Sequence, residues 1–169
     1  MSSAAQLQNQ IAELGPWHQN IEIKDGISTF PKVGGGRRRG FQQLMRQIWP
    51  DGLSGKTFID SACNAGAYCF WAKELGASET FGFDVREEWI RQARLVLDNR
   101  EGPTDGMTFE RMDLYDIPSI GDRRFDIAWF SGIFYHLPDP VTGLKLVADR
   151  TDEVLYVSTG TLTVDGEGA

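Results

Sequence analysis

Three aspartates in this chain of 169 residues stand where a ligand could meet them together. Asp60, Asp84 and Asp113 each follow a short run of strand-forming residues that contains phenylalanine. A carboxylate can accept paired, charge-assisted hydrogen bonds, for example from the two hydroxyls of a ribose. A single aspartate at a strand end is often only a turn or helix cap. Three at successive strand ends are more specific and indicate a binding site for a polar ligand.

A loop of small residues follows the first of these aspartates. Residues 61–66 read Ser-Ala-Cys-Asn-Ala-Gly, so a ligand could approach the backbone closely, and the free amides of the next helix would point at it. A dinucleotide-binding loop needs glycines at the spacing G-x-G-x-x-G, where this chain has Ala62, Asn64 and Ala67. These substitutions count against a bound pyrophosphate, and therefore against a nicotinamide-dependent oxidoreductase. Cys63 in this loop is expected to be a small buried filler rather than a nucleophile.

The elements that must position these residues alternate from residue 56 onward. The pattern predicts strands over 56–60, 80–84, 107–112, 125–130 and 153–157, and helices over 66–75, 86–99 and 140–150. Helices between successive strands imply right-handed crossovers, and therefore an α/β fold with a doubly wound, mostly parallel, Rossmann-like sheet. In such a sheet ligands bind beyond the carboxyl ends of the strands, where the winding direction reverses, so we expect the three aspartates at one edge.

The first 50 residues differ from the rest in pattern and charge, and we expect an arm over 1–50 and a ligand-binding domain over 51–169. The arm begins with a helix that Gly15-Pro16 ends. Residues 34–40, Gly-Gly-Gly-Arg-Arg-Arg-Gly, are expected to form a mobile basic loop. The net charge is +3 in the arm and −10 in the remainder. An acidic body does not favour general nucleic-acid binding, but Arg37–Arg39 could meet phosphate if they are more than a solvated face.

The composition excludes several classes of protein. A content of 41% hydrophobic and 24% charged residues is typical of a globular domain. Two cysteines and two histidines are too few for a disulfide scaffold or a Cys/His zinc cluster, so no metal site is expected. No stretch is long and apolar enough to span a membrane, and the N-terminus lacks a basic start followed by an apolar run. We therefore expect a cytoplasmic protein with reduced cysteines.

Several segments together resemble the successive motifs of a known family. Residues 58–66, Gly82–Asp84 and Met112–Asp113 resemble those of class I S-adenosylmethionine-dependent methyltransferases. Residues 130–140, which contain Tyr135-His136, resemble more narrowly the tRNA wobble-uridine methyltransferases, which make 5-methoxy- or 5-carboxymethoxyuridine. Further segments that fit this group are 15–17, 25–27 and 162–166. The resemblance implies S-adenosylmethionine as the cofactor and methyl transfer to an oxygen or other nucleophile, on a tRNA wobble uridine or on a small metabolite.

The resemblance also implies a role for each matching residue on the cofactor side. Asp60 and the loop after it would hold the methionyl portion, Asp84 the ribose, and Asp113 the adenine amino group. The other cofactor-binding residues would be Ser61, Ala62, Cys63, Asn64 and Gly66 in the loop, Val85 and Arg86 beside the adenine, Met112 and Leu114 against its ring, and Ser131 near the transferable methyl group.

On the substrate side, the resemblance implies Tyr135 and His136 as the catalytic residues. An oxygen nucleophile can need a base, and His136 is the histidine beside the predicted site. The same side chain could instead hydrogen-bond the loop and orient Tyr135. Two further residues also have alternatives. Trp17 could cover the cofactor or anchor the arm. Asp116 could form a metal-binding or acid/base pair with Asp113, but a cap is the simpler explanation for it.

The chain departs from the family pattern in three places. Ala62 replaces the first glycine of the family's D-x-G loop. Leu14 precedes Gly15-Pro16 where the carboxymethyl-transferring members have a basic residue, so ordinary S-adenosylmethionine is expected. The sequence ends soon after the fifth strand, so the last strands of the full fold are expected to be missing and the fifth strand to be an exposed edge.

This edge leaves two explanations open. Either the chain is truncated, or a second copy or a partner chain covers the fifth strand. The alternative to an enzyme is an inactive cofactor-binding module that acts through such a partner.

Overall fold

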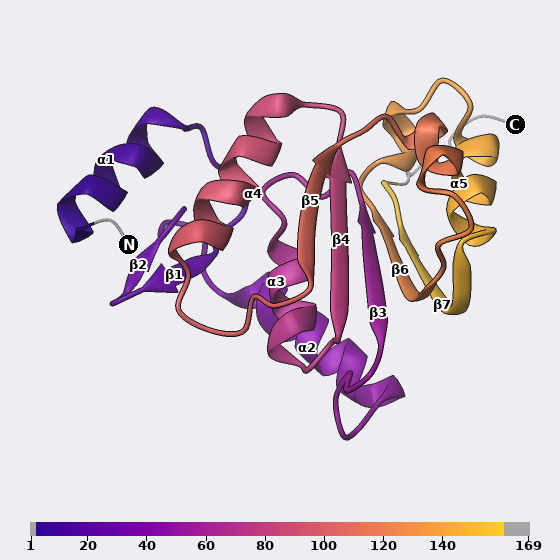
Figure 1. The fold of residues 1–169 in the computed structure, drawn as a ribbon, viewed down its shortest axis with the longest axis horizontal. Coiled ribbons are helices and arrows are strands. Elements are labelled where there is room, and N and C mark those ends of the chain that lie inside the picture. Colours follow the sequence, from indigo (N-terminus) through magenta and orange to yellow (C-terminus); the bar gives the residue numbers. More distant parts are fainter. Residues whose placement is uncertain (1–2, 161–169) are drawn as a thin grey trace, which may run out of the picture.

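The computed structural model describes residues 3–160, and its centre is a five-stranded parallel sheet (Figure 1). The closing segment 162–166 lies outside the described residues. The strands of the sheet are β3 (Thr57–Ser61), β4 (Glu79–Asp84), β5 (Met107–Arg111), β6 (Phe125–Ser131) and β7 (Thr151–Ser158). A separate hairpin is formed by β1 (Glu22–Lys24) and β2 (Ile27–Ser28). The helices are α1 (Ala4–Glu13), α2 (Gly36–Ile48), α3 (Ala67–Glu74), α4 (Glu87–Asn99) and α5 (Pro140–Ala148), with short 3-10 helices η1 (Leu114–Ile120) and η2 (Phe134–His136).

β3 lies at the point where the winding of the sheet reverses. The strand order is β5-β4-β3-β6-β7, so the chain moves outward from β3 on one side and then returns to β3's other side with β6 and β7. Every pair in this sheet is parallel. The doubly wound α/β fold is therefore confirmed, with all the strands and helices predicted after residue 56.

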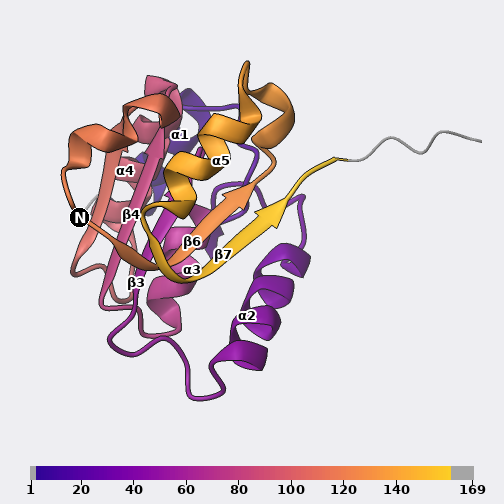
Figure 2. The same cartoon turned by 90° about the vertical axis from the view of Figure 1, so that its right-hand side faces the viewer.

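Helices cover both faces of the sheet, which is why its strands are nearly continuous apolar runs. α2, α3 and α4 pack on one face around the first core, which includes Phe58, Phe70 and Trp129. α5 and η1 pack on the other face around the second core, which includes Ile59 and Phe81. Figure 2 shows α2 and α5 on opposite sides of β6 and β7. No helix in residues 3–160 combines the length and apolar character needed to cross a lipid bilayer.

The N-terminal arm packs against the first core through Trp17. Only 7% of this residue is exposed, and its indole Nε1 donates a hydrogen bond to the carbonyl of Ile11 at 2.7 Å. Gln92 on α4 holds the same segment, because its Nε2 donates to the carbonyls of Leu14 and Pro16 at 2.7 and 2.9 Å. Of the two roles considered for Trp17, the anchoring one is observed.

The expectation of a mobile loop over 34–40 is wrong from Gly36 onward. α2 begins at this glycine and carries all three arginines. Arginine is a good helix former, and the buried apolar face of α2 stabilises the helix through tertiary packing. Arg38 also forms ion pairs with Glu22 at 3.2 Å and Glu74 at 2.9 Å, which fix the first turn.

β7 forms one edge of the sheet within the described residues. It pairs with β6, and its Val157 is 43% exposed. Its inner part is well anchored, because Tyr156 stacks on Trp129 of β6 with ring centroids 3.8 Å apart. The fifth strand of the sheet is thus an edge strand over residues 3–160, as expected.

Candidate active site

Asp60 and Asp84 lie at the carboxyl ends of neighbouring strands. Asp60 in β3 stands opposite Gly82 of β4, and Asp84 is the last residue of β4. Both aspartates are only 2% exposed. Asp84 accepts hydrogen bonds from the backbone amides of Asn64 at 3.1 Å and Arg86 at 3.0 Å, whereas Oδ2 of Asp60 has no partner among the described residues. A buried oxygen without a partner is costly, so this edge favours a ligand that brings a hydrogen-bond donor.

Burial raises the pKa of both carboxyl groups. The pKa of Asp60 lies well above its usual range, chiefly because burial disfavours the charged form and secondly because Asp84 is a nearby like charge. The pKa of Asp84 is also raised by burial, although the amides of Arg86 and Asn64 favour its ionised form and act in the opposite direction. A cation bound beside Asp60 would stabilise the ionised carboxylate, so the site favours a positively charged ligand.

The loop after β3 has a left-handed backbone at three positions. Ala62 has a φ of 58°, Asn64 of 53° and Gly66 of 82°. Ala62 therefore follows the path that glycine would take, at a cost of about 1 kcal/mol. Asn64 reinforces the loop because its side-chain oxygen accepts a hydrogen bond from the amide of Ala65 at 2.8 Å. Gly66 has a second constraint, since a Cβ there would collide with the ring of Phe109.

A residue that the sequence did not indicate, Gln19, spans this loop. Its Nε2 donates to the carbonyl of Cys63 at 3.2 Å, and its Oε1 accepts from the amide of Ala67 at 3.1 Å. These partners lie 44 and 48 residues later in the chain. No local motif could have revealed the contact.

The two residues predicted beside the adenine lie between β4 and α4, close to the arm. Val85 is 53% exposed, next to Asp84. The guanidinium of Arg86 lies over the ring of Trp89, 4.3 Å from its centroid. The ring of His18 meets the same indole edge-on, with centroids 5.9 Å apart. Arg86 is thus held by an aromatic side chain at the rim, a contact that the sequence did not predict.

Asp113 is the N-cap of η1, so the assignment of the cap to Asp116 is wrong. The Asp113 backbone is extended, and its Oδ1 accepts a hydrogen bond from the amide of Tyr115 at 3.0 Å. Asp113 is exposed, which leaves other lone pairs of its carboxylate accessible. Met112 beside it is half-buried, whereas Leu114 is 4% exposed and packs in the second core rather than at the rim.

Three predicted residues lie at or just after the end of the fourth strand of the sheet. Ser131 is the last residue of β6 and is half-buried. Tyr135 and His136 are exposed in η2, with their rings 4.4 Å apart. Within residues 3–160 the imidazole makes no hydrogen bond to another residue, so it contacts Tyr135 but is not tied to the loop.

Both cysteines are buried and free. Burial raises the pKa of the thiols of Cys63 and Cys69 well above their usual range. A protonated buried thiol is a poor nucleophile. The filler role expected for Cys63 is confirmed.

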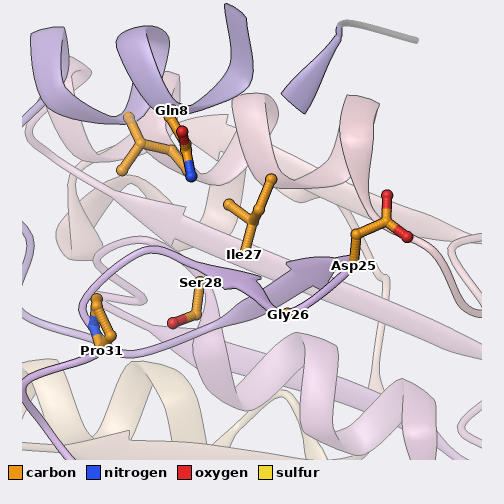
Figure 3. A pocket seen from close by; sticks show the side chains of 7 residues that line it. Gln8, Asp25, Gly26, Ile27, Ser28 and Pro31 are labelled. Carbon is orange, nitrogen blue, oxygen red and sulfur yellow. The ribbon is translucent and has the colours of Figure 1, made fainter. Parts of the chain in front are cut away.

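A cavity of about 360 Å³ lies elsewhere, between α1 and the β1–β2 hairpin (Figure 3). Ile27 of the hairpin points toward α1, which contributes Gln8 to the lining. Asp25 is the single titratable residue of the lining. The cavity therefore lacks the paired carboxyl groups found at the sheet edge, and we place the candidate active site at that edge.

Comparison with known families finds one that matches more than half of the chain. Residues 59–149 match the family described as "Methyltransferase domain". The chain belongs to this family. The match runs from β3 to just beyond α5 and includes Asp60, Asp84 and Asp113, and the resemblance to S-adenosylmethionine-dependent methyltransferases is confirmed.

Relatives of this methyltransferase domain are considerably longer. A tRNA U34 carboxymethyltransferase of Campylobacter hominis is 30% identical over 115 residues, which are 68% of this chain and 39% of the relative. A protein of the same name from Nautilia profundicola is 29% identical over 115 residues, or 37% of its length. The chain thus matches less than two fifths of the length of each of these curated relatives.

A solved structure shares the fold. The N-terminal domain of EvdMO1 with SAH bound superposes with a TM-score of 0.70 and 20% sequence identity, over 94% of this chain and 63% of that one. At this identity the likeness is one of fold alone.

Proposed function

We propose that this methyltransferase domain binds S-adenosylmethionine at the carboxyl edge of β3, β4 and β5 and directs its methyl group to an oxygen nucleophile. The observation that carries the proposal is the pair of buried carboxyl groups at adjacent strand ends, one of which, Asp60, has an oxygen without a partner in residues 3–160. The cofactor is an adenosine that bears a sulfonium and an amino-acid group. It combines the hydroxyls and positive charges that such a pair favours.

The residues at this edge fit the cofactor chemically. An ammonium group beside Asp60 would give its Oδ2 a donor and would stabilise its charge. Asp84 uses one lone pair on each oxygen for a backbone amide, and each oxygen retains another for a hydroxyl. Asp113 is exposed at the next strand end and would accept from the adenine amino group. Ala62 keeps the left-handed backbone of the loop, so its presence is no reason to favour an inactive module.

The bound cofactor supplies the electrophile, a methyl group on a positively charged sulfur. What remains for the protein is to hold the acceptor in line and to manage a proton. Ser131 and Tyr135 would line the acceptor's position, and His136 would take the proton from an oxygen nucleophile. The imidazole is exposed and free of other hydrogen bonds within the described residues, as an accessible base requires.

A tRNA wobble uridine is the acceptor that we propose to test first. The curated relatives are named for this position, at about 30% identity. Leu14 offers no charge partner for an additional cofactor carboxylate, which favours a methyl over a carboxymethyl group. Two exposed arginines on α2, Arg37 and Arg39, could meet phosphate. A small metabolite hydroxyl is the competing acceptor, since the chain spans only part of its relatives.

Transfer of an isotope-labelled methyl group tests the proposal. The chain is incubated with labelled S-adenosylmethionine and either tRNA whose wobble uridine carries a free 5-hydroxyl group, the oxygen that would accept the methyl group, or a pool of small metabolites, and the products are resolved as nucleosides and metabolites. Label on a wobble uridine supports the first acceptor, and label on a metabolite supports the second. Cofactor binding without label on either pool would contradict an enzyme and support the inactive module.

A further inference from the structure

We infer that Gln19 is a positioning residue that holds the cofactor loop in its binding conformation. The inference rests on the proposed function, because it concerns the same site. The arm crosses the start of α3, and the Gln19 amide group forms one hydrogen bond with each end of the segment from Cys63 to Ala67. One side chain therefore bridges the two ends of this turn, in addition to the hydrogen bond from the Gly66 amide to the Cys63 carbonyl at 2.9 Å within the turn.

The loop needs an external brace because its own backbone is unfavourable. Ala62 and Asn64 both adopt left-handed conformations that residues with a side chain adopt at a cost. α3 also begins with Gly66 as N-cap, and no side chain from within the loop caps its first amides. The carboxamide of Gln19 supplies that cap from the arm by accepting from the Ala67 amide.

The brace is itself rigid. The carbonyl of Gln19 accepts a hydrogen bond from the Thr29 hydroxyl at 2.7 Å, and the same hydroxyl accepts from the amide of Ile21 at 2.9 Å. Thr29 is 5% exposed and Ile21 is fully buried, so this segment of the arm cannot move without disturbing the core. Gln92 fixes the chain on the other side, at Leu14 and Pro16.

The consequence is a dependence of cofactor affinity on a residue that need not touch the cofactor. When the brace is lost, the loop is expected to populate other conformations, and the apparent affinity falls by the fraction that remains competent. In turnover the KM for the cofactor is expected to rise while kcat stays the same, because Gln19 acts through the loop and not on the reacting atoms.

Gln19→Leu removes both hydrogen bonds at similar size, and Asn20→Ala is its matched control. Asn20 is the next residue, but its side chain holds the arm to Val33 and Phe30 instead of to the loop. We expect Gln19→Leu to weaken S-adenosylhomocysteine binding, measured by calorimetry on the whole chain, by at least about tenfold. Asn20→Ala is expected to change this affinity by less than about twofold. If the two variants have the same melting temperature, the difference in affinity is not caused by a difference in stability.

Hydrogen exchange of the free protein gives a second measurement. Faster exchange of the Ala67 amide is expected in Gln19→Leu but not in Gln19→Glu, because glutamate retains the acceptor for that amide while losing the donor to Cys63. If Gln19→Leu does not fold, Gln19→Glu should still bind S-adenosylhomocysteine more weakly than the wild type.

The outcomes separate the two proposals. Unchanged S-adenosylhomocysteine affinity in a folded Gln19 variant would overturn the role of Gln19 and leave the proposed function intact. A wild-type chain that does not bind S-adenosylhomocysteine would overturn the proposed function, and unchanged Ala67 exchange in Gln19→Leu would then separately overturn the brace.

Discussion

At the scale of single residues, Asp60 lowers the stability of the free protein but is suited to bind a positively charged ligand. Its carboxyl group is buried and lies near a second carboxyl group, and one of its oxygens has no partner in the part of the chain that the structure describes. A site selected for stability alone would place a neutral or paired side chain there. A positively charged ligand that completes the site would offset this loss of stability. Strained or unpaired groups are generally concentrated at functional sites for this reason.

Asp60→Asn is predicted to stabilise the free protein and to impair binding. The folded-state pKa of Asp60 is raised, so the folded state binds the proton more tightly than the unfolded state does. The free energy of unfolding therefore falls as pH rises from the unfolded value, about 3.9, to the raised value. The variant lacks this loss and should therefore be more stable than the wild type at neutral pH.

Urea unfolding of Asp60→Asn across the acidic to neutral range checks this prediction. Below the unfolded pKa the pH-dependent part of the difference in stability should vanish, since Asp60 is then neutral in both states. Asp116→Asn serves as the control, because Asp116 is exposed. An Asp60→Asn variant that is less stable at neutral pH, or that binds S-adenosylhomocysteine as well as the wild type, would contradict the account of this carboxyl group.

His136→Gln is predicted to lower kcat by about 10²-fold or more, with unchanged binding of S-adenosylhomocysteine. If the imidazole is the base, the pH profile of the rate should differ between the variant and the wild type. Steady-state rates over a range of pH provide the measurement. His18→Gln is the matched control for the loss of an imidazole. His18 contacts Trp89 on the predicted adenine side, so its loss is expected to act on cofactor binding and to leave kcat unchanged. An unchanged pH profile in His136→Gln would exclude the base.

At the scale of elements, the loop between β3 and α3 departs most from ordinary backbone geometry. Ala62→Gly is predicted to raise the free energy of unfolding by up to about 1 kcal/mol, because glycine takes a left-handed conformation without steric cost. Ala65→Gly in the same loop should lower the free energy of unfolding. Ala65 is buried and its φ is not positive, so the glycine removes a buried methyl group and adds backbone entropy to the unfolded state without relieving strain. Denaturant unfolding measures both, and equal signs would count against the strain assigned to Ala62.

The strands and their connections could be predicted from sequence for a physical reason. A parallel sheet covered on both faces needs nearly continuous apolar runs. In β3, for example, Phe58 packs in the core on one face and Ile59 in the core on the other. The start of α2 could not be predicted in this way. Its glycines suggested a loop, and what makes the segment helical is tertiary, namely the buried face of α2 and the ion pairs of Arg38 with Glu22 and Glu74.

The site could be predicted only as far as it follows strand ends. Asp60, Asp84 and Asp113 mark three successive ends and were found from that pattern. Which aspartate caps η1 depends on one extended backbone conformation, at Asp113, that the sequence does not fix. Gln19 was missed because its contacts join segments more than 40 residues apart.

At the scale of the whole molecule, charge is unevenly distributed, and this distribution gives the tRNA proposal a test. The chain carries a net charge of −7, yet its first 50 residues are basic. Arg38 is engaged in ion pairs, which leaves Arg37 and Arg39 exposed beside it on α2. Phosphate contacts by these two side chains would make the affinity for tRNA fall with salt.

The double substitution Arg37→Glu/Arg39→Glu is predicted to weaken tRNA binding and to reduce the slope of log K against log salt by about 2. Binding of S-adenosylhomocysteine should not change. Arg91→Glu/Lys145→Glu, at exposed positions on α4 and α5, changes the net charge by the same amount and is the control. Filter binding over a salt series gives the slopes. Equal slopes for the double variant and the wild type would remove α2 from the proposed tRNA interface.

Titration calorimetry with S-adenosylhomocysteine, alongside NAD and the Asp84→Ala variant, tests the central claim most directly. The account predicts one S-adenosylhomocysteine per chain with a dissociation constant below about 1 mM, strong weakening in Asp84→Ala, and no heat with NAD at the same concentrations. A wild-type chain that gives no heat with S-adenosylhomocysteine, or that binds NAD more tightly, would contradict it.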